Sequence, residues 1–539
     1  MAEEPLVLLT SVLDQVYTPN SLQNQSTRWG SLISTFRNTY AHPPHFITRA
    51  PGRVNIIGEH IDYSRFSVLP SAIEPDLLIA ASAEYSPDPK PSDPSVQVRA
   101  INVNPSYPEV SFQYQPHTKI FIGNGGWSDY LKSAFNTCLS HLIKCASSSD
   151  ADADADADAN VDAELRFPTS IQLLIDGTVP AGSGLSSSAA ITTASVLAVL
   201  YMHQSPKKQH VISKSLVASL AIAAEKACGI SVGGMDQTAS VFGQPAKLLH
   251  IEFTPTIQVV PLQLPHSPPT TFIIANSLVT STKLDSAKEQ YNLRVVECRI
   301  ATRLISDTLL KEKARYPKDL RELVELYAPQ DPIPLAIQRV LDSLPDVHLL
   351  GGPAGLTHQS ILQNLGINQQ QFETHILDGM VVEPRGGIYK PYNRARHVLT
   401  EAKRVYEFRE LLEKKAGSEE HSEGVIVSIG RLMNESQTSC RQDYECSCDA
   451  LDELISIATS NGSLGSRLTG AGWGGSSVHL VRDQDISKLI EAFKAHYYSI
   501  HFPNLSAKQL ADACFPTKPE GGACLFTPLD GTSSLNVQP

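Results

Sequence analysis

The feature that most constrains the fold is a segment that is apolar on every side of a helix, residues 191–202. Such a helix is stable only where other elements cover its whole surface, so it must lie inside a sizeable core. An Ala-, Ser- and Gly-rich loop leads directly into it. The chain has 539 residues, more than one core ordinarily serves, which predicts two domains or a pair that shares a cleft.

Short apolar runs bounded by Pro, Asp or Gly predict strands in the first half, at 46–47, 77–80 and 171–175. A further helix is predicted over 211–228, with Gly229 at the end position that favours a left-handed residue. After a predicted strand at 272–275 the chain becomes helix-rich, with helical spacing over 286–310, 394–412 and 449–460. We therefore expect a mixed first domain, residues 1–268, and a helix-rich second domain, residues 269–539.

The formal net charge of −12 is concentrated in one segment. Residues 150–164 carry seven acidic and no basic side chains, which leaves about −5 for the rest of the chain. The Asp-Ala alternation cannot bury apolar surface and repels itself, so we expect a disordered surface insertion over about 147–163. The sequence shows no basic stripe of the kind that nucleic-acid binding needs, and no direct nucleic-acid partner is expected.

Cysteine usage and the N-terminus indicate a cytoplasmic protein. The nine cysteines are odd in number and lack the spacing of a disulfide framework or a paired zinc site, which predicts reduced thiols. Glu3 and Glu4 stand where a signal peptide would be positive, and no apolar run approaches membrane-spanning length. We expect neither secretion nor a membrane partner.

The loop before the apolar helix has the composition of a phosphate cradle. Its glycines allow the backbone to approach phosphate oxygens, the following helix N-terminus favours anions, and a serine hydroxyl can coordinate Mg²⁺. The alternative is a flexible loop that caps a helix, but Pro180 and the packed Ser-Ser-Ser-Ala run favour a functional role. It lacks the Lys-Ser/Thr of a Walker A loop. The predicted phosphate-binding residues are Gly182, Ser183, Gly184, Leu185, Ser186, Ser187 and Ser188.

A second glycine-rich stretch, 470–475, formally contains the spacing of a dinucleotide-binding fingerprint. That fingerprint must open a helix, whereas the following residues 476–481 alternate as in a strand. We therefore predict a turn that packs against a ligand or another loop.

Residues 49–63 crowd Arg, Glu, His and Asp side chains into one turn-rich stretch. Each of them alone is typical of a surface residue or of a group whose hydrogen bonds are satisfied locally. Together they offer several donors and acceptors at short spacing, which a polyhydroxylated sugar needs in order to be held in one orientation.

This stretch closely resembles the galactokinase signature, and the loop 179–190 and the turn 470–475 resemble the second and third motifs of GHMP small-molecule kinases, in the expected order. The resemblance extends over nearly the whole chain, through 233–237, 291–299, 444–448 and 517–519, and leaves out the insertion. It implies a two-domain α+β fold, with a ribosomal-S5-domain-2-like N-terminal domain, a ferredoxin-like C-terminal domain and the site in the cleft between them. The implied reaction is ATP-dependent phosphorylation of α-D-galactose at the anomeric hydroxyl, the first committed step of galactose catabolism.

The resemblance also implies roles for individual residues. Asp236 would be the general base, and Arg53 would hold Asp236 ionised or polarise the nucleophile and neutralise phosphoryl charge, since phosphoryl transfer depends on positioning and charge stabilisation. Ser188 and Glu225 resemble the Mg²⁺ ligands, although Glu225 could instead be a solvated helix carboxylate. The residues that match sugar contacts are Glu59, His60, Asp62, Gly233 and Tyr291. Trp127 and Tyr130 resemble the aromatic pair near adenine, a spacing that more often belongs to a core.

Two alternatives to a galactokinase stay open. The first is an N-acetylgalactosamine kinase. Phe66 stands where many galactokinases have glycine, and this form is similar to the branch that holds fungal galactokinases and N-acetylgalactosamine kinases. The other alternative is a galactose- and ATP-sensing transcriptional co-inducer with a repressor as partner. Such inducers have a shortened Ser-Ala stretch, whereas residues 186–190 are complete here, which favours an enzyme. We expect a monomer that binds galactose and MgATP.

Overall fold

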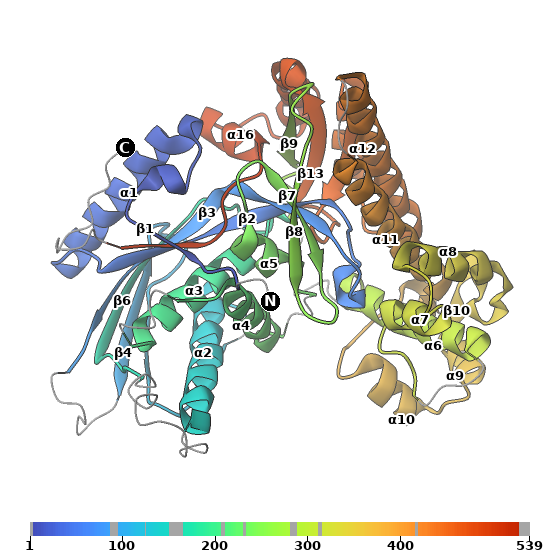
Figure 1. Ribbon diagram of the computed structural model, residues 1–539, viewed down its shortest axis with the longest axis horizontal. Helices are drawn as coiled ribbons and strands as arrows, with labels where there is room; N and C mark the ends of the chain where they lie inside the picture. Colours follow the sequence, from blue (N-terminus) through green and yellow to red (C-terminus); the bar gives the residue numbers. More distant parts are fainter. Residues whose placement is uncertain are drawn as a thin grey trace.

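The computed structural model describes residues 4–86, 95–123, 125–149, 165–205, 211–229, 233–280, 288–310, 315–414 and 419–527. A seven-stranded sheet forms the first half (Figure 1), and one of its strands comes from the end of the chain. The strands are, in spatial order, β1 (Leu8–Thr10), β15 (Cys524–Phe526), β2 (Phe46–Ile57), β3 (Leu69–Glu84), β6 (Ser170–Gly177), β4 (Val96–Asn102) and β5 (Val110–Tyr114). Most neighbours are antiparallel, while β1 with β15 and β4 with β6 are parallel.

Helices cover both faces of this sheet, because alternate residues of its strands point to opposite sides. Phe46 and Ile79 face one core, whereas Ile47 and Leu78 face the other. The first core contains α3 (Ser187–His203), with α2 (Trp127–Ser149), α4 (Lys214–Ala227) and α5 (Met235–Phe242) packed around it. The second lies under α1 (Pro19–Tyr40). The apolar segment 191–202 is thus confirmed as a helix enclosed by other elements.

A second, four-stranded antiparallel sheet has the order β12 (Gly465–Thr469), β13 (Ser476–Arg482), β9 (Thr270–Asn276) and β14 (Cys514–Thr517). Helices α13 (Asp449–Ser460), α14 (Ile486–Phe493) and α16 (Ala507–Ala513) pack near it, and α15 (Ser499–His501) follows α14. The hairpin β7 (Lys247–Glu252) and β8 (Gln258–Gln263) forms a small separate sheet, as do β10 (Leu356–Thr357) and β11 (Ile388–Tyr389).

A group of helices forms a helical lobe on the right of Figure 1. It includes α6 (Tyr291–Leu309), α7 (Leu320–Tyr327), α8 (Ile333–Ser343), α9 (His358–Leu365), α10 (Gln369–Phe372), α11 (Pro391–Glu413) and α12 (Glu419–Ser439). Helix α11 packs against α6, α8 and α12 and also contacts β2 of the first sheet, and α12 also packs on β12 of the second sheet. The lobe is therefore joined directly to the strand that carries the signature residues.

The predicted α+β class and the predicted strands and helices are confirmed, with shifted ends. The helix predicted from 211 begins at Lys214, because the Ser213 hydroxyl accepts the Leu216 N–H as a cap. The helix predicted from 286 begins at Tyr291. The predicted insertion starts too early, since α2 continues through Ser149; residues 150–163 lie outside the described residues. The predicted boundary near 268 falls between β8 and β9 and stays a prediction, and β15 joins the sheet of the first half.

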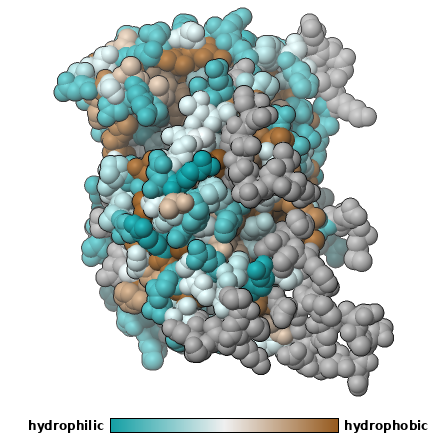
Figure 2. Space-filling model, turned by 90° about the vertical axis from the view of Figure 1, so that its left-hand side faces the viewer, coloured by the Kyte–Doolittle hydropathy of each residue, from teal (hydrophilic) through white to brown (hydrophobic). Residues whose placement is uncertain are grey.

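No helix in the described part of the chain is both long and apolar enough to cross a membrane. All nine cysteines are free thiols. Figure 2 shows hydrophobic side chains that reach the surface in separate places among hydrophilic ones on the side of the molecule it presents.

Candidate active site

Strand β2 carries the signature residues into the middle of the molecule. All of its residues are buried, and it leads to Gly58, whose φ of 105° suits glycine. His60 follows with a φ of 60°, a left-handed conformation that is uncommon for a residue with a side chain. The chain reverses at this point, so that Glu59, His60 and Asp62 lie on one compact turn.

Asp236, the predicted base, lies in the first turn of α5 and meets two other motifs. Its Oδ1 accepts hydrogen bonds from Arg53 Nε at 2.8 Å and lies 2.8 Å from Arg53 Nη2. Its Oδ2 accepts a hydrogen bond from the Ser186 hydroxyl at 2.6 Å. Arg53 Nη1 also donates to the Gly184 carbonyl at 2.6 Å. The signature strand, the phosphate loop and the Met-Asp-Gln turn therefore converge on one carboxylate.

Two further carboxylates surround this point, and burial makes both harder to ionise. Arg467 Nη2 and the Gly470 N–H donate to Glu59 Oε2, at 3.1 and 3.0 Å. Burial raises the pKa of Glu59 to about 7, although the charge of Arg467 opposes this. Burial also raises the pKa of Asp62 to about 6, and the negative charge of Asp236 adds to the effect.

An aromatic wall closes one side of the turn. The His60 ring lies 4.7 Å from the Tyr444 ring, 5.6 Å from the Tyr291 ring and 5.6 Å from the Trp473 ring. His60 Nε2 lies 2.9 Å from the Ala471 carbonyl oxygen, so Nε2 carries the proton. Burial lowers the pKa of His60 to about 3, which leaves the ring neutral and its Nδ1 an acceptor.

Tyr291 and Gly233 complete the predicted sugar-binding set. Tyr291 is the first residue of α6, and burial together with the charges of Asp62 and Asp236 raises the pKa of its hydroxyl. Gly233 packs so closely on Asp62 that an added Cβ would lie 2.3 Å from the Asp62 Cγ. The structure therefore brings all five predicted sugar-binding residues to the surroundings of Asp236.

The two glycine-rich segments pack against each other backbone to backbone. A Cβ on Gly470 would lie 2.5 Å from the Gly184 carbonyl oxygen, and one on Gly475 would lie 2.9 Å from the Ser183 carbonyl oxygen. The Ser476 hydroxyl donates to the same Ser183 oxygen at 2.8 Å. The prediction that the turn 470–475 packs against another loop is confirmed, and its partner is the phosphate loop.

The predicted phosphate-binding residues differ in what they can present. The Leu185 side chain is buried in the core, and its carbonyl accepts the Arg53 N–H at 3.1 Å. Ser183 and Ser186 already donate their hydroxyls, to the Pro180 carbonyl and to Asp236. The half-buried Ser187 and Ser188 lie in the first turn of α3. Their hydroxyls make no hydrogen bond within the described residues and can serve a ligand.

The predicted metal ligands lie on two helices that contact each other, Ser188 at the start of α3 and Glu225 near the end of α4. Glu225 is 1% exposed, so the alternative that it is a solvated carboxylate is wrong. The Gln237 amide donates to Glu225 Oε2, while Gln237 Oε1 is buried with no partner among the described residues. Carboxylate, hydroxyl and amide oxygens are donors that Mg²⁺ accepts, so this set fits that ion. No group of three or more His, Cys, Asp or Glu side chains in the described chain could hold a metal, so phosphate and water oxygens would complete the coordination.

The predicted adenine pair lies at the start of α2. Trp127 Nε1 donates to the Pro108 carbonyl at 3.2 Å, and both rings are half-buried. Burial raises the pKa of the Tyr130 hydroxyl, and the charge of Glu225 adds to this, so Tyr130 lies close to the predicted metal ligand. Both residues therefore pack partly into the core and partly face outward.

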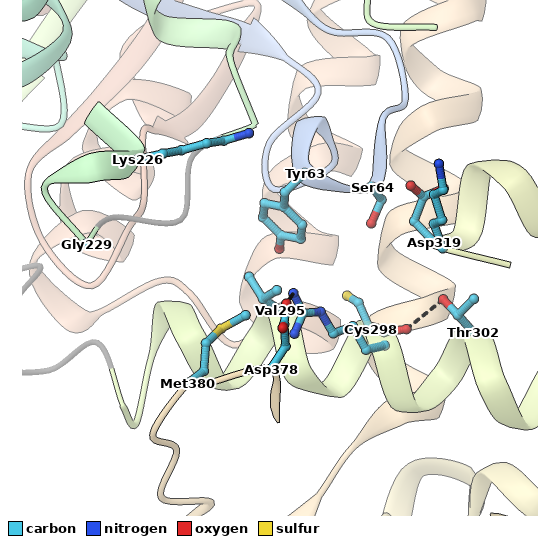
Figure 3. Close-up of a pocket in the computed structure, with 12 residues that line it drawn as sticks. Tyr63, Ser64, Lys226, Gly229, Val295, Cys298, Thr302, Asp319, Asp378 and Met380 are labelled. Carbon is cyan, nitrogen blue, oxygen red and sulfur yellow. Dashed lines mark hydrogen bonds and ion pairs between the residues drawn. The ribbon is translucent and has the colours of Figure 1, made fainter. Parts of the chain in front are cut away.

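A cavity of about 530 Å³ lies between the end of α4 and the helix α6 (Figure 3). Lys226 and Gly229 at the end of α4 face Val295, Cys298 and Thr302 of α6 across it. Tyr63, next to Asp62, also lines it, but none of the five predicted sugar-binding residues does, all of which the structure describes.

Sequence patterns missed several residues that shape the site. Arg467 is fully buried beside Glu59, and a charged residue inside a strand was the only available signal. Asp129 accepts the N–H groups of Gly123, Gly125 and Gly126, at 2.9, 2.9 and 3.1 Å, and so fixes the loop before Trp127. Its place after a pair of glycines at a helix start could have indicated this.

Comparisons with known proteins agree with the geometry. The galactokinase galactose-binding signature matches residues 34–83, the GHMP kinases N-terminal domain matches 155–244, and the GHMP kinases C-terminal domain matches 408–499. Galactokinase of Saccharomyces cerevisiae is 35% identical, over 92% of this chain and 94% of its own. Galactokinase of Dictyostelium discoideum is 32% identical, over 96% of this chain and 97% of its own.

A solved structure of Lactococcus lactis galactokinase complexed with galactose covers 92% of this chain and 99% of its own, with a TM-score of 0.59 and 21% identity. This likeness shows the shared fold. Because the sequence identity to the eukaryotic relatives extends over nearly the whole of both chains, the chain belongs to the galactokinase family of GHMP kinases.

Proposed function

We propose that this protein is a galactokinase, which transfers the γ-phosphoryl group of ATP to the anomeric hydroxyl of α-D-galactose and forms galactose 1-phosphate and ADP. The observation that carries the proposal is the placement of Asp236, held by Arg53 and Ser186 where the signature turn meets the phosphate loop. The names of the relatives support the same activity.

In the proposed reaction, Asp236 accepts the proton of the anomeric hydroxyl while that oxygen forms its bond to the γ-phosphorus. The bond between this phosphorus and the ADP oxygen breaks at the same time. Arg53 holds Asp236 in place and puts a positive charge beside the transferred group, where negative charge spreads over three oxygens. The Arg53 bond to the Gly184 carbonyl keeps the guanidinium aligned with the phosphate loop.

The signature turn supplies the groups that orient the sugar. Glu59 and Asp62 accept hydrogen bonds from sugar hydroxyls, and neutral His60 accepts one at Nδ1. Tyr291 adds a phenolic hydroxyl and one face of the aromatic wall. A sugar with several hydroxyls can thus be fixed with one of them directed at Asp236.

Ser187 and Ser188, the Gly182–Gly184 backbone and the α3 N-terminus would bind the ATP phosphates. Trp127 and Tyr130 would lie against the adenine. Ser188 and Glu225 would hold Mg²⁺, and Gln237 would orient Glu225. When bound, the ion would offset the negative charge of the phosphates.

The test is an ADP-release assay with galactose, N-acetylgalactosamine and glucose in parallel. We expect turnover with galactose well above that with the other two sugars. Preference for N-acetylgalactosamine would replace the proposed substrate with the alternative sugar. ADP release with none of the sugars, from a protein that still binds galactose and ATP, would refute the kinase proposal and favour a sensor.

A further inference from the structure

We infer that His397 and Glu401, one turn apart on α11, are positioning residues for sugar binding, which hold the backbone of the Gly58–Glu59–His60 turn from the helical lobe. The inference rests on the proposed function, in which this turn orients galactose.

Glu401 binds the turn by accepting hydrogen bonds from two of the turn's backbone N–H groups. Its Oε1 accepts the Gly58 N–H at 2.9 Å and the Glu59 N–H at 3.2 Å. The Ser436 hydroxyl of α12 donates to the same oxygen at 2.7 Å, and Arg404 Nη1 donates to Oε2 at 2.8 Å. Glu401 has no exposed surface, and nearby Arg404 and Arg467 hold the pKa of its carboxyl down at about 2 against the effect of burial. A buried and ionised acceptor on α11 thus fixes the position of the turn.

His397 binds the backbone carbonyl of Glu59. Its Nε2 lies 3.0 Å from the Glu59 carbonyl oxygen, so this nitrogen carries the proton and donates. Its Nδ1 lies 2.9 Å from the Ser439 hydroxyl, which donates in turn. Burial lowers the pKa of His397 to about 4, which keeps the ring neutral and this pattern fixed. Both polar backbone groups of Glu59 are therefore bound by α11.

Helical spacing places a third residue of α11 against the turn. Residues four apart lie on one face, so Val405 follows Glu401 as Glu401 follows His397. A Cβ on Gly58 would lie 3.1 Å from Val405 Cγ2 and 3.0 Å from the Cα of Val68, the residue before β3. The turn is thus enclosed between α11 and the first sheet.

The ring of Tyr444 connects the same helix to the sugar-facing side. It lies 4.4 Å from the His397 ring and 4.7 Å from the His60 ring. Arg394, one turn before His397, donates to the Asp443 carbonyl next to Tyr444. Movement of α11 would therefore displace both the backbone of Glu59 and the aromatic wall beside His60.

The consequence for function is specific to the sugar. Glu59 keeps its backbone orientation only while its N–H and C=O are bound, and its carboxylate is aimed by that backbone. ATP contacts, in contrast, come from the phosphate loop and α2, which have no hydrogen bond to His397 or Glu401 within the described residues. Weakening the α11 contacts should reduce galactose affinity while ATP affinity is retained.

The test compares Glu401→Gln with Glu410→Gln, a matched change on the exposed side of the same helix, where Glu410 pairs with Lys414 at 3.0 Å. Calorimetry measures galactose and ATP affinity, and thermal unfolding is followed with and without galactose. For Glu401→Gln we expect about tenfold weaker galactose binding and ATP binding within twofold, because the two N–H groups of the turn would then bind a neutral acceptor in place of a charged one. Glu410→Gln should match the wild type in both.

A second pair guards against a folding defect in Glu401→Gln. His397→Leu removes the donor to the Glu59 carbonyl, whereas His397→Gln keeps an N–H donor on a side chain of similar size. We expect galactose affinity to fall in the Leu variant and to be largely rescued in the Gln variant. If both folded variants bound galactose as the wild type does, with only the melting temperature lowered, the positioning role would be wrong. A wild-type protein that failed to bind galactose would instead overturn the proposed function.

Discussion

At the scale of single residues, Asp236 shows why its role can be tested separately from its contacts. Each carboxylate oxygen has its own donor, Arg53 for Oδ1 and Ser186 for Oδ2. An asparagine can keep its oxygen towards Arg53 and turn its amide to Ser186, whose hydroxyl can accept as well as donate. The side chain would stay in place but lose its negative charge and, with it, the ability to take a proton.

We therefore predict that Asp236→Asn folds and binds galactose and ATP, while kcat falls by about 10²- to 10⁴-fold, the usual contribution of a positioned general base. Stopped-assay turnover and melting temperatures with and without each ligand provide the measurement. A folded variant that retains most of its turnover would show that Asp236 is not the base, and that Arg53 and the loop supply the rate enhancement.

Glu59 gives a prediction on pH dependence, because burial raises its pKa to about 7 in the folded protein. Between an unfolded pKa near 4.5 and this value, the folded state binds more protons than the unfolded state. The contribution of Glu59 to stability is thus fully present below about 4.5 and is lost as pH rises through about 7.

In denaturant unfolding, wild type should lose stability relative to Glu59→Gln between pH 5 and pH 8, by about 1 to 3 kcal/mol at most. Comparing the change in each protein cancels groups that both share. An equal or opposite change in the two proteins would mean that Glu59 has no raised pKa in the folded state.

At the scale of elements, sequence periodicity predicted those parts whose structure is local. The segment 191–202 lies inside α3, and α13 has the predicted bounds of 449 and 460. The start of α4 shifted because the Ser213 side chain caps its first turn. The predicted sugar, phosphate and base residues come from motifs, since each motif is a short local segment that must adopt one conformation.

The positioning residues could not be found in this way. Glu401 lies more than 340 residues from the turn that it holds, and nothing in the sequence of α11 distinguishes it from the other carboxylates there. The same holds for the contact between Arg467 and Glu59, because the packing of β12 against β2 brings these two residues together. Long-range polar contacts of this kind depend on how whole elements dock, which local patterns do not encode.

The packing of the two glycine-rich loops gives a prediction at this scale. Gly470→Ala should raise the KM for ATP and lower stability, because the added Cβ would lie 2.5 Å from the Gly184 carbonyl oxygen and displace the phosphate loop. Gly462→Ala is the control, since Gly462 also has a positive φ, of 97°, but nothing lies nearer to its Cβ position than 4.0 Å.

The control measures backbone strain alone, about 1 kcal/mol or somewhat more. We expect Gly462→Ala to lower the melting temperature without changing either KM. If Gly470→Ala affected stability by the same amount and left the KM for ATP unchanged, the two loops would not be coupled in function.

At the scale of the whole molecule, the ends of the chain close the first sheet. Strand β15 lies between β1 and β2, and Phe526 packs on Trp29 of α1 with ring centroids 5.1 Å apart. Arg49 of β2 joins these parts, because its Nε lies 2.6 Å from Asp76 Oδ2 and its Nη1 donates to the Gly521 carbonyl at 2.7 Å. The signature strand therefore depends on a residue 472 positions away.

This arrangement predicts that truncation before Ala523 destabilises the protein severely and also weakens galactose binding. Removing β15 exposes the edge of β2, leaves a void against Trp29 and takes away the contacts of three residues that are each at most 2% exposed. Loss of Phe526 alone, in Phe526→Ala, should cost about 3 to 5 kcal/mol.

Truncation after Thr527 is the control, because it leaves every described strand and helix intact. Urea unfolding and galactose titration of the three proteins give the measurement. The prediction would be wrong if the protein cut before Ala523 unfolded at the wild-type urea concentration and bound galactose normally. In that case β3 and the helices alone would hold β2, and β15 would not contribute to the position of the sugar site.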